Sequence, residues 1–109
     1  MLTGRAGNGG ADRIYGEGGA DTAYAGSGAD WVDGGAGADE LHGQAGADAL
    51  HAGTGNGDLL HGGDGDDVLT GSDLGGDTLR GAGGADLLYG LGGADTIEGG
   101  SGEDLVYAG

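Results

Sequence analysis

The 109-residue sequence contains no cysteine, no proline and no phenylalanine, and it has only three basic residues. Without cysteine, disulfide bonds, thiol chemistry and cysteine-based zinc sites are excluded. Without proline, a collagen-like triple helix is excluded, although glycine contributes 33 residues. Arg5, Arg13 and Arg80 are too few to form the basic surface that nucleic acid requires, and 19 acidic residues repel phosphate. No nucleic-acid partner is therefore expected.

Long apolar segments are also missing. No stretch approaches the ~20 residues that span a bilayer, and no basic start followed by an apolar run marks a cleavable signal. Leu, Ile, Val and Phe together supply 17 residues, while the net charge is −16. This combination is typical of chains that stay disordered on their own. A folded state therefore needs a ligand of opposite charge.

What the sequence does contain is a nine-residue unit that recurs eleven times. The clearest copy, residues 34–42, has the pattern G-G-x-G-x-D-x-U-x, where U is aliphatic. A core residue lies two places after each aspartate, from Ile14 to Val106. Such a fixed period indicates a solenoid, and this pattern is typical of calcium-binding β-helix repeats. The position-6 aspartates are Asp12, Asp21, Asp30, Asp39, Asp48, Asp58, Asp67, Asp77, Asp86, Asp95 and Asp104.

Regular copies span residues 7–107, with partial copies at both ends, so residues 1–109 are predicted to form a single repeat domain. Leu2 is expected to take the core position of the first partial copy. The copies 52–61 and 71–80 each hold one surplus residue before the aspartate, where a turn accommodates it without reversing the strand. The last three residues of a unit alternate out-in-out, as in a short strand. Two units per coil predict an all-β, right-handed parallel β-roll, a β-solenoid with its aliphatic residues inside.

Stacked coils place each aspartate near the aspartate two units later, for example Asp30 near Asp48 and Asp39 near Asp58. Aligned carboxylates repel each other unless they are protonated or bridged by a cation. Carboxylate and backbone carbonyl oxygens, with no nitrogen or sulfur ligand, suit a hard cation, and calcium better than magnesium. Pairing neighbouring turns along each edge gives up to about nine calcium sites. All eleven aspartates are candidate ligands, and solvated turn residues are the simpler alternative.

The sequence resembles the RTX (repeats-in-toxin) family over nearly all of residues 7–107. The resemblance implies a calcium-loaded parallel β-roll in which each position-6 aspartate binds calcium together with carbonyl oxygens of the glycine-rich turn. It also implies a structural module of a bacterial protein that is exported by type I secretion and folds in calcium-rich extracellular surroundings. The pattern is not uniform, because Ala25 and Ala52 replace the first glycine. The 71–80 unit is the most irregular, so the site of Asp77 is the least secure.

Two alternatives to a purely structural module remain. The chain is compatible with an extracellular interaction or adhesion module, or an accessory repeat block of a larger secreted toxin, protease or epimerase. It is also compatible with a minimal or idealised β-roll that self-associates end to end, since Leu87, Tyr89, Leu105 and Tyr107 are expected near an uncapped end.

Catalysis and transition-metal binding have weaker support. His42 and His61 occupy position 9 of alternate units and are expected to stack on one face, where they would capture a transition metal or simply remain solvated. Solvated histidines are the favoured interpretation. Serines fall in turns whereas histidines end strands, so no serine–histidine–aspartate site is indicated. The chain is expected not to be an enzyme.

Overall fold

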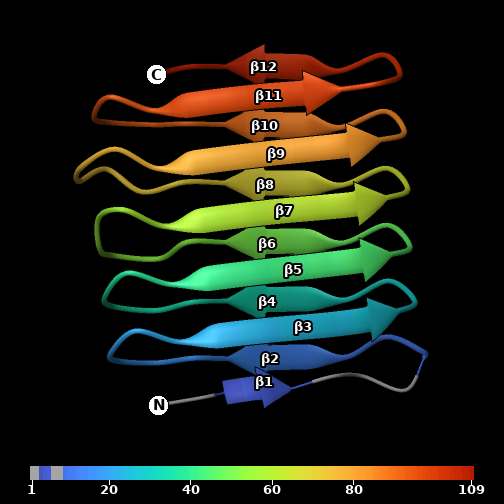
Figure 1. Ribbon diagram of the computed structural model, residues 1–109, viewed down its shortest axis with the longest axis horizontal. Helices are drawn as coiled ribbons and strands as arrows, with labels where there is room; N and C mark the ends of the chain where they lie inside the picture. The colour runs from blue at the N-terminus through green and yellow to red at the C-terminus, as the bar shows by residue number, and fades with distance from the viewer. Residues whose placement is uncertain (1–2, 6–8) are drawn as a thin grey trace.

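The computed structural model describes residues 3–5 and 9–109, and within these residues all regular structure is β-strand. Two six-stranded parallel sheets stack face to face (Figure 1). Sheet A contains β1 (Thr3–Arg5), β3 (Thr22–Ser27), β5 (Glu40–Ala45), β7 (Leu59–Asp64), β9 (Thr78–Gly83) and β11 (Thr96–Gly100), in this spatial order. Sheet B contains β2 (Arg13–Tyr15), β4 (Trp31–Asp33), β6 (Ala49–His51), β8 (Val68–Thr70), β10 (Leu87–Tyr89) and β12 (Leu105–Tyr107).

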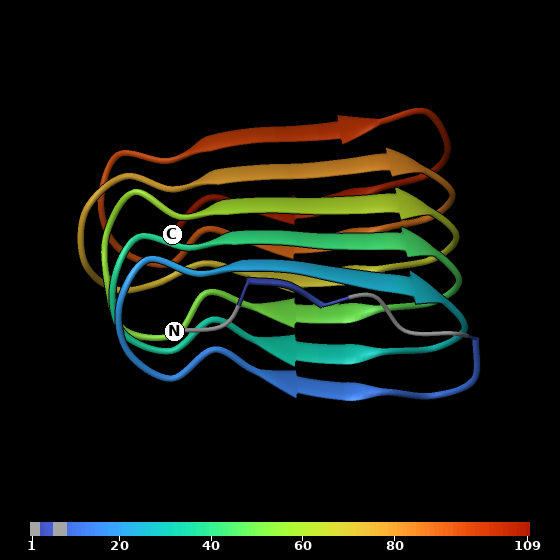
Figure 2. The ribbon, with the colours of Figure 1, turned by 60° about the horizontal axis from the view of Figure 1, so that its bottom comes forward.

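Consecutive strands alternate between the two sheets, so that two strands and two turns make one coil. The chain runs one way through sheet A, turns, and returns through sheet B one layer further along (Figures 1 and 2). From the N-terminal to the C-terminal end this path is right-handed. The predicted right-handed parallel β-roll is confirmed, with about five coils in the stack.

The core is a column of apolar residues, formed mainly by the second residue of each strand and completed by Ala25 and Ala52. In sheet A, Leu41 pairs with Leu60, and Leu60 with Leu79, each nineteen residues apart. The extra residues of the two ten-residue units therefore lie in the turns, as predicted, because the strand register is unchanged. The fully buried core residues are Ala23, Ala25, Val32, Leu41, Leu50, Ala52, Leu60, Leu69, Leu79 and Leu88.

The two sheets differ in strand length. Sheet B has three-residue strands, as the repeat predicts, but β3, β5, β7 and β9 of sheet A are six residues long. The prediction of uniformly short strands is wrong for sheet A, because its strands continue into the first half of the following turn. There Gln44 pairs with Gly26 on one side and with Gly63 on the other. One edge of the roll is thus held by more backbone pairing than the other.

The ends of the stack are less covered than its middle. Val106 of β12 is 43 % exposed, whereas the equivalent Leu88 one coil earlier is fully buried. The expected positions of Leu2 and of the turn that begins at Gly7 lie outside the described residues. Over the described ranges, no helix has the length and apolar character needed to cross a membrane.

Candidate metal centre

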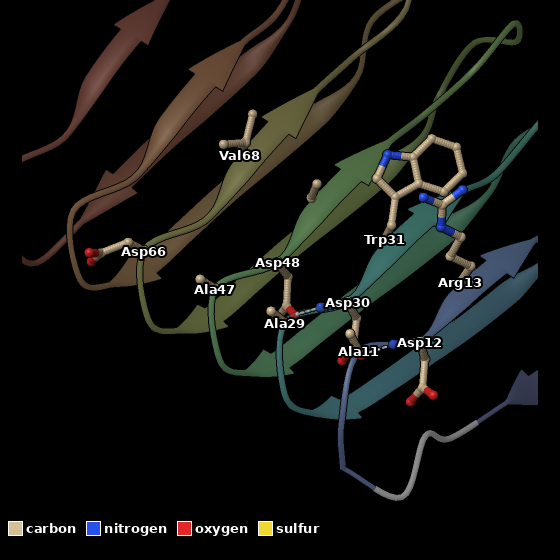
Figure 3. Close-up of a pocket in the computed structure, with 11 residues that line it drawn as sticks. Ala11, Asp12, Arg13, Ala29, Asp30, Trp31, Ala47, Asp48, Asp66 and Val68 are labelled. Atoms are coloured by element: carbon tan, nitrogen blue, oxygen red, sulfur yellow. Dashed lines mark hydrogen bonds between the residues drawn. The ribbon is translucent and has the colours of Figure 1, made fainter.

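Two ladders of aspartates run along the two edges of the roll. The first ladder lies in the turns that lead into sheet B, and the second in the turns that lead into sheet A. Within each ladder, the backbone N–H of one aspartate donates a hydrogen bond to Oδ1 of the aspartate one coil later. For example, Asp30 N donates to Asp48 Oδ1 at 2.9 Å, and Figure 3 shows this contact beside Asp12.

Such bonds bridge all nine intervals of the two ladders, at distances of 2.7–3.0 Å. The predicted proximity of Asp30 to Asp48 and of Asp39 to Asp58 is confirmed. The first ladder comprises Asp12, Asp30, Asp48, Asp67, Asp86 and Asp104; the second comprises Asp21, Asp39, Asp58, Asp77 and Asp95. The Oδ1 oxygen of each bridging carboxylate therefore already accepts a hydrogen bond from a backbone N–H.

The other carboxylate oxygen, Oδ2, is buried without a hydrogen-bond partner among the described residues in eight of these aspartates. They are Asp12, Asp30, Asp39, Asp48, Asp58, Asp67, Asp86 and Asp95. A buried acceptor that makes no hydrogen bond costs about 1–3 kcal/mol, and more when it is charged. These eight oxygens therefore require a proton or a cation.

The first glycine of a turn lies directly against Oδ2 of its own aspartate. A Cβ atom at Gly34 would lie 2.5 Å from Asp39 Oδ2 and 2.9 Å from the carbonyl oxygen of Ala52 in the next coil. Gly34 does not adopt a positive φ, so glycine is required here for space and not for its dihedral freedom. At Ala25 and Ala52 a buried methyl group occupies the equivalent place.

Burial and repulsion raise the pKa values of five ladder carboxyls, those of Asp39, Asp48, Asp58, Asp67 and Asp86. The pKa of Asp67 rises to about 7, chiefly through desolvation, against the opposing effect of the hydrogen bond from Asp48 N–H and with added repulsion from Asp48 and Asp86. For the same kinds of reason the pKa values of Asp48 and Asp58 rise to about 6. Without a cation, the middle of each ladder therefore holds protons at pH values where exposed aspartates are ionised.

The atoms available to bind a metal ion are oxygens of two kinds, carboxylate Oδ2 atoms and turn carbonyls. Within the described part of the chain, no group of three or more His, Asp or Glu side chains is arranged to hold one metal ion. An ion in a ladder would therefore take most of its ligands from the backbone. Calcium accepts mixed carboxylate and carbonyl oxygens at variable geometry, so this donor set fits calcium.

A comparison with protein-family models matches the RTX calcium-binding nonapeptide repeat in four copies, at residues 6–41, 24–59, 53–73 and 72–106. The chain belongs to this family. The RTX repeat is a structural calcium-binding module, and the resemblance read from the motif is confirmed. Searches of curated proteins and of solved structures found no match.

One RTX turn departs from the pattern of the others in a way that the sequence analysis did not identify. Asp77 Oδ2, unlike the eight oxygens above, accepts hydrogen bonds from the backbone N–H and the hydroxyl of Ser72. The sequence analysis marked the 71–80 unit as the most irregular and the Asp77 site as the least secure, but a polar residue at position 2 does not by itself indicate this closure, because Glu17 and Gln44 occupy that position in other turns.

The outer faces of the RTX roll carry rows of rings. His42 and His61 lie one coil apart on the same face, as predicted, with ring centroids 5.8 Å apart and ring planes tilted by 43°, and the Tyr24 ring stacks on His42 at 4.8 Å. His42 Nε2 lies 2.8 Å from Glu40 Oε1. The contacts between these rings are cross-strand packing.

On sheet B, Tyr15, Trp31 and His51 form a similar row. Trp31 also borders a shallow groove of about 400 Å³ beside the first ladder (Figure 3). Its floor includes a row of small side chains, Ala29 and Ala47 among them. The groove is open to solvent, and it is lined by Asp12, Asp30 and Asp48 of the first ladder and by Asp66, which belongs to neither ladder.

Proposed function

We propose that the ladder aspartates bind calcium in the intervals between stacked turns, and that this binding drives the folding of the chain. The observation that carries the proposal is the set of eight buried Oδ2 atoms without a hydrogen-bond partner. Each bound ion would supply positive charge to Oδ2 and to nearby turn carbonyls. The candidate ligands are the eleven aspartates of the two ladders, with Asp77 treated separately below.

Coupling of binding to folding follows from the arrangement of charge. In the unfolded chain the aspartates are solvated and lie nine or ten residues apart. The folded roll brings them one coil apart and buries them, which is unfavourable for a chain of net charge −16. A ligand that binds only the folded state stabilises it by mass action. Calcium-binding free energy therefore becomes folding free energy.

The biological setting is part of the same proposal. RTX repeats typically belong to secreted bacterial proteins, which favours an extracellular location reached by type I secretion. A chain that stays unfolded at low calcium is suited to export, and it then folds outside, where calcium is abundant. On this reading the module has a structural role and carries no catalytic site.

The test is a calcium titration of chelator-treated protein at neutral pH, followed by far-UV circular dichroism, with magnesium as the control ion. We expect a cooperative gain of β signal with calcium and little gain with magnesium. A full β signal in chelator would show that stacking alone carries the fold, and the proposal would fail.

The matched variants for this test are Asp67→Asn and Asp64→Asn. Asp67 is buried in the first ladder, whereas Asp64, three residues earlier, is exposed and belongs to neither ladder. Only the change at Asp67 should raise the calcium concentration needed for folding. Equal shifts in the two variants would indicate general charge screening and not a site.

A further inference from the structure

The turn formed by residues 71–77 has a different backbone from the other turns. In the other described turns the residue at position 2 has a left-handed φ of 70–100°, whether or not it is glycine. These residues are Glu17, Gly26, Gly35, Gln44, Gly53, Gly63, Ala82, Leu91 and Gly100. Ser72 occupies the same position but does not adopt a positive φ. Its side chain and amide are consequently free to point elsewhere.

They point at the aspartate of their own turn. Ser72 N donates to Asp77 Oδ2 at 2.8 Å, and the Ser72 hydroxyl lies 2.9 Å from the same oxygen. Both residues are only 1 % exposed. Asp77 Oδ1 accepts the usual ladder bond from Asp58 N. Both oxygens of this carboxylate are therefore hydrogen-bonded by the protein itself.

The Ser72 hydroxyl also lies within hydrogen-bond distance of two backbone carbonyls. Its Oγ is 2.8 Å from the oxygen of Leu74 in the same turn and 2.8 Å from the oxygen of Gly55 in the preceding coil. A carboxylate and carbonyls from two successive turns thus surround a single hydroxyl group. They are the same kinds of oxygen that would ligate calcium elsewhere, at about 2.3–2.6 Å from the ion. An ion cannot bind this set while Oγ remains among them.

We propose that Ser72 replaces a calcium ion, so that the 71–77 turn is closed by hydrogen bonds and binds no metal. The inference rests on the proposed function of the other turns. It has two physical supports. The backbone N–H groups of Asp58 and Ser72 already donate to the two oxygens of Asp77, and the Ser72 hydroxyl fills the space in which the oxygens converge. The second ladder then binds one calcium ion fewer than it would if every interval between its turns held an ion.

The experiment counts calcium ions per folded chain by native mass spectrometry at saturating calcium, with equilibrium dialysis as an independent count. Ser72→Gly removes the hydroxyl and installs the residue that accepts the left-handed φ of the other turns. The matched control is Ser101→Gly, because Ser101 is an exposed serine in the 99–104 turn. We expect Ser72→Gly to bind one more calcium ion than the parent chain, and Ser101→Gly to bind the same number.

Each other outcome has a defined meaning. A parent chain that binds no calcium refutes the proposed function itself. An unchanged count in Ser72→Gly refutes the replacement of an ion by Ser72, and a count lower by one would make Ser72 a ligand instead, which also overturns the inference.

A second pair of variants covers the case in which Ser72→Gly fails to fold. Asp77→Asn should leave the number of ions bound by the folded fraction unchanged, whereas Asp58→Asn, one coil earlier in the same ladder, should lower it. Equal losses in both variants would place Asp77 among the ligands and reject the inference.

Discussion

Leu60 and Asp58 lie two residues apart in one repeat and are equally buried, at 0 % and 1 % exposed. Leu60 stacks between Leu41 and Leu79, and each apolar neighbour removes more of its surface from water. Asp58 stacks between Asp39 and Asp77, and burial with repulsion from both raises its pKa to about 6. Regular stacking therefore stabilises the apolar column. In the absence of a cation, it destabilises the aspartate ladders.

The comparison explains how one short motif makes a fold that responds to a ligand. The apolar column supplies burial at any ion concentration, but it is thin, with about one large side chain per strand. The two ladders oppose that gain until their charge is neutralised. Folding therefore depends on what binds the ladders, and the following changes separate the two contributions.

The largest effect is expected from a cavity in the apolar column. Leu60→Ala should lower the free energy of unfolding of the calcium-loaded protein by about 2–5 kcal/mol, because a fully buried side chain is truncated. Urea unfolding at saturating calcium measures this loss. The number of bound ions should stay the same, and a lower count would mean that core and ladder cannot be separated.

A substitution in a ladder should change calcium binding, which the core substitution leaves unchanged. Asp48→Asn should raise the calcium concentration at the folding midpoint and reduce the number of bound ions, because Asp48 Oδ2 is one of the buried oxygens that lack a partner. The loss in the free energy of unfolding should be about 1–3 kcal/mol at a fixed, subsaturating calcium concentration. The measurements are a circular dichroism titration and an ion count. An unchanged midpoint would contradict the stacked-ladder site.

Protons should replace calcium in part. The pKa of Asp67 is about 7 in the folded chain against 3.8 normally, so between these values the folded state binds a proton that the unfolded state does not. The metal-free roll should therefore gain stability as the pH falls from 7 towards 4, and lose it as the pH rises through 7. Circular dichroism of the chelated protein against pH measures this.

The same protons should replace part of the calcium, so the calcium concentration at the folding midpoint should be lower at pH 6 than at pH 8. Asp48 and Asp58, whose pKa values rise to about 6, act in the same direction. A metal-free β signal that decreases on mild acidification would contradict this account of the ladder.

The smallest effect is expected in the turns, away from both columns. Ala82 has a φ of 76°, a conformation that costs a side-chain-bearing residue about 1–2 kcal/mol. Ala82→Gly should therefore stabilise the calcium-loaded protein, by about 1 kcal/mol or less after the entropy cost of glycine. Ala85→Gly is the control, because the exposed Ala85 of the same turn has no positive φ and should be slightly destabilised. Thermal unfolding of both variants checks the difference in sign.

Much of this protein is determined by its sequence alone. The nine-residue period sets the coils, and the alternation of side chains along a strand sets which residue points inward. The surplus residues before Asp58 and Asp77 are placed in turns by that same alternation, because a strand would otherwise reverse its faces. The two aspartate ladders follow directly. All of these features depend on local spacing, which a single sequence displays in full.

Other features were decided by contacts between successive coils and by how the atoms of each turn pack. The longer strands of sheet A arise because Gln44 and its equivalents pair beyond the repeat's strand segment. The need for glycine at Gly34 comes from the approach of a carboxylate and a carbonyl of the next coil, and not from its own φ. The closure of the Asp77 turn by Ser72 depends on carbonyls from two successive turns. Spacing along the chain indicates which residues meet, but only the packed turns determine which of their atoms face each other.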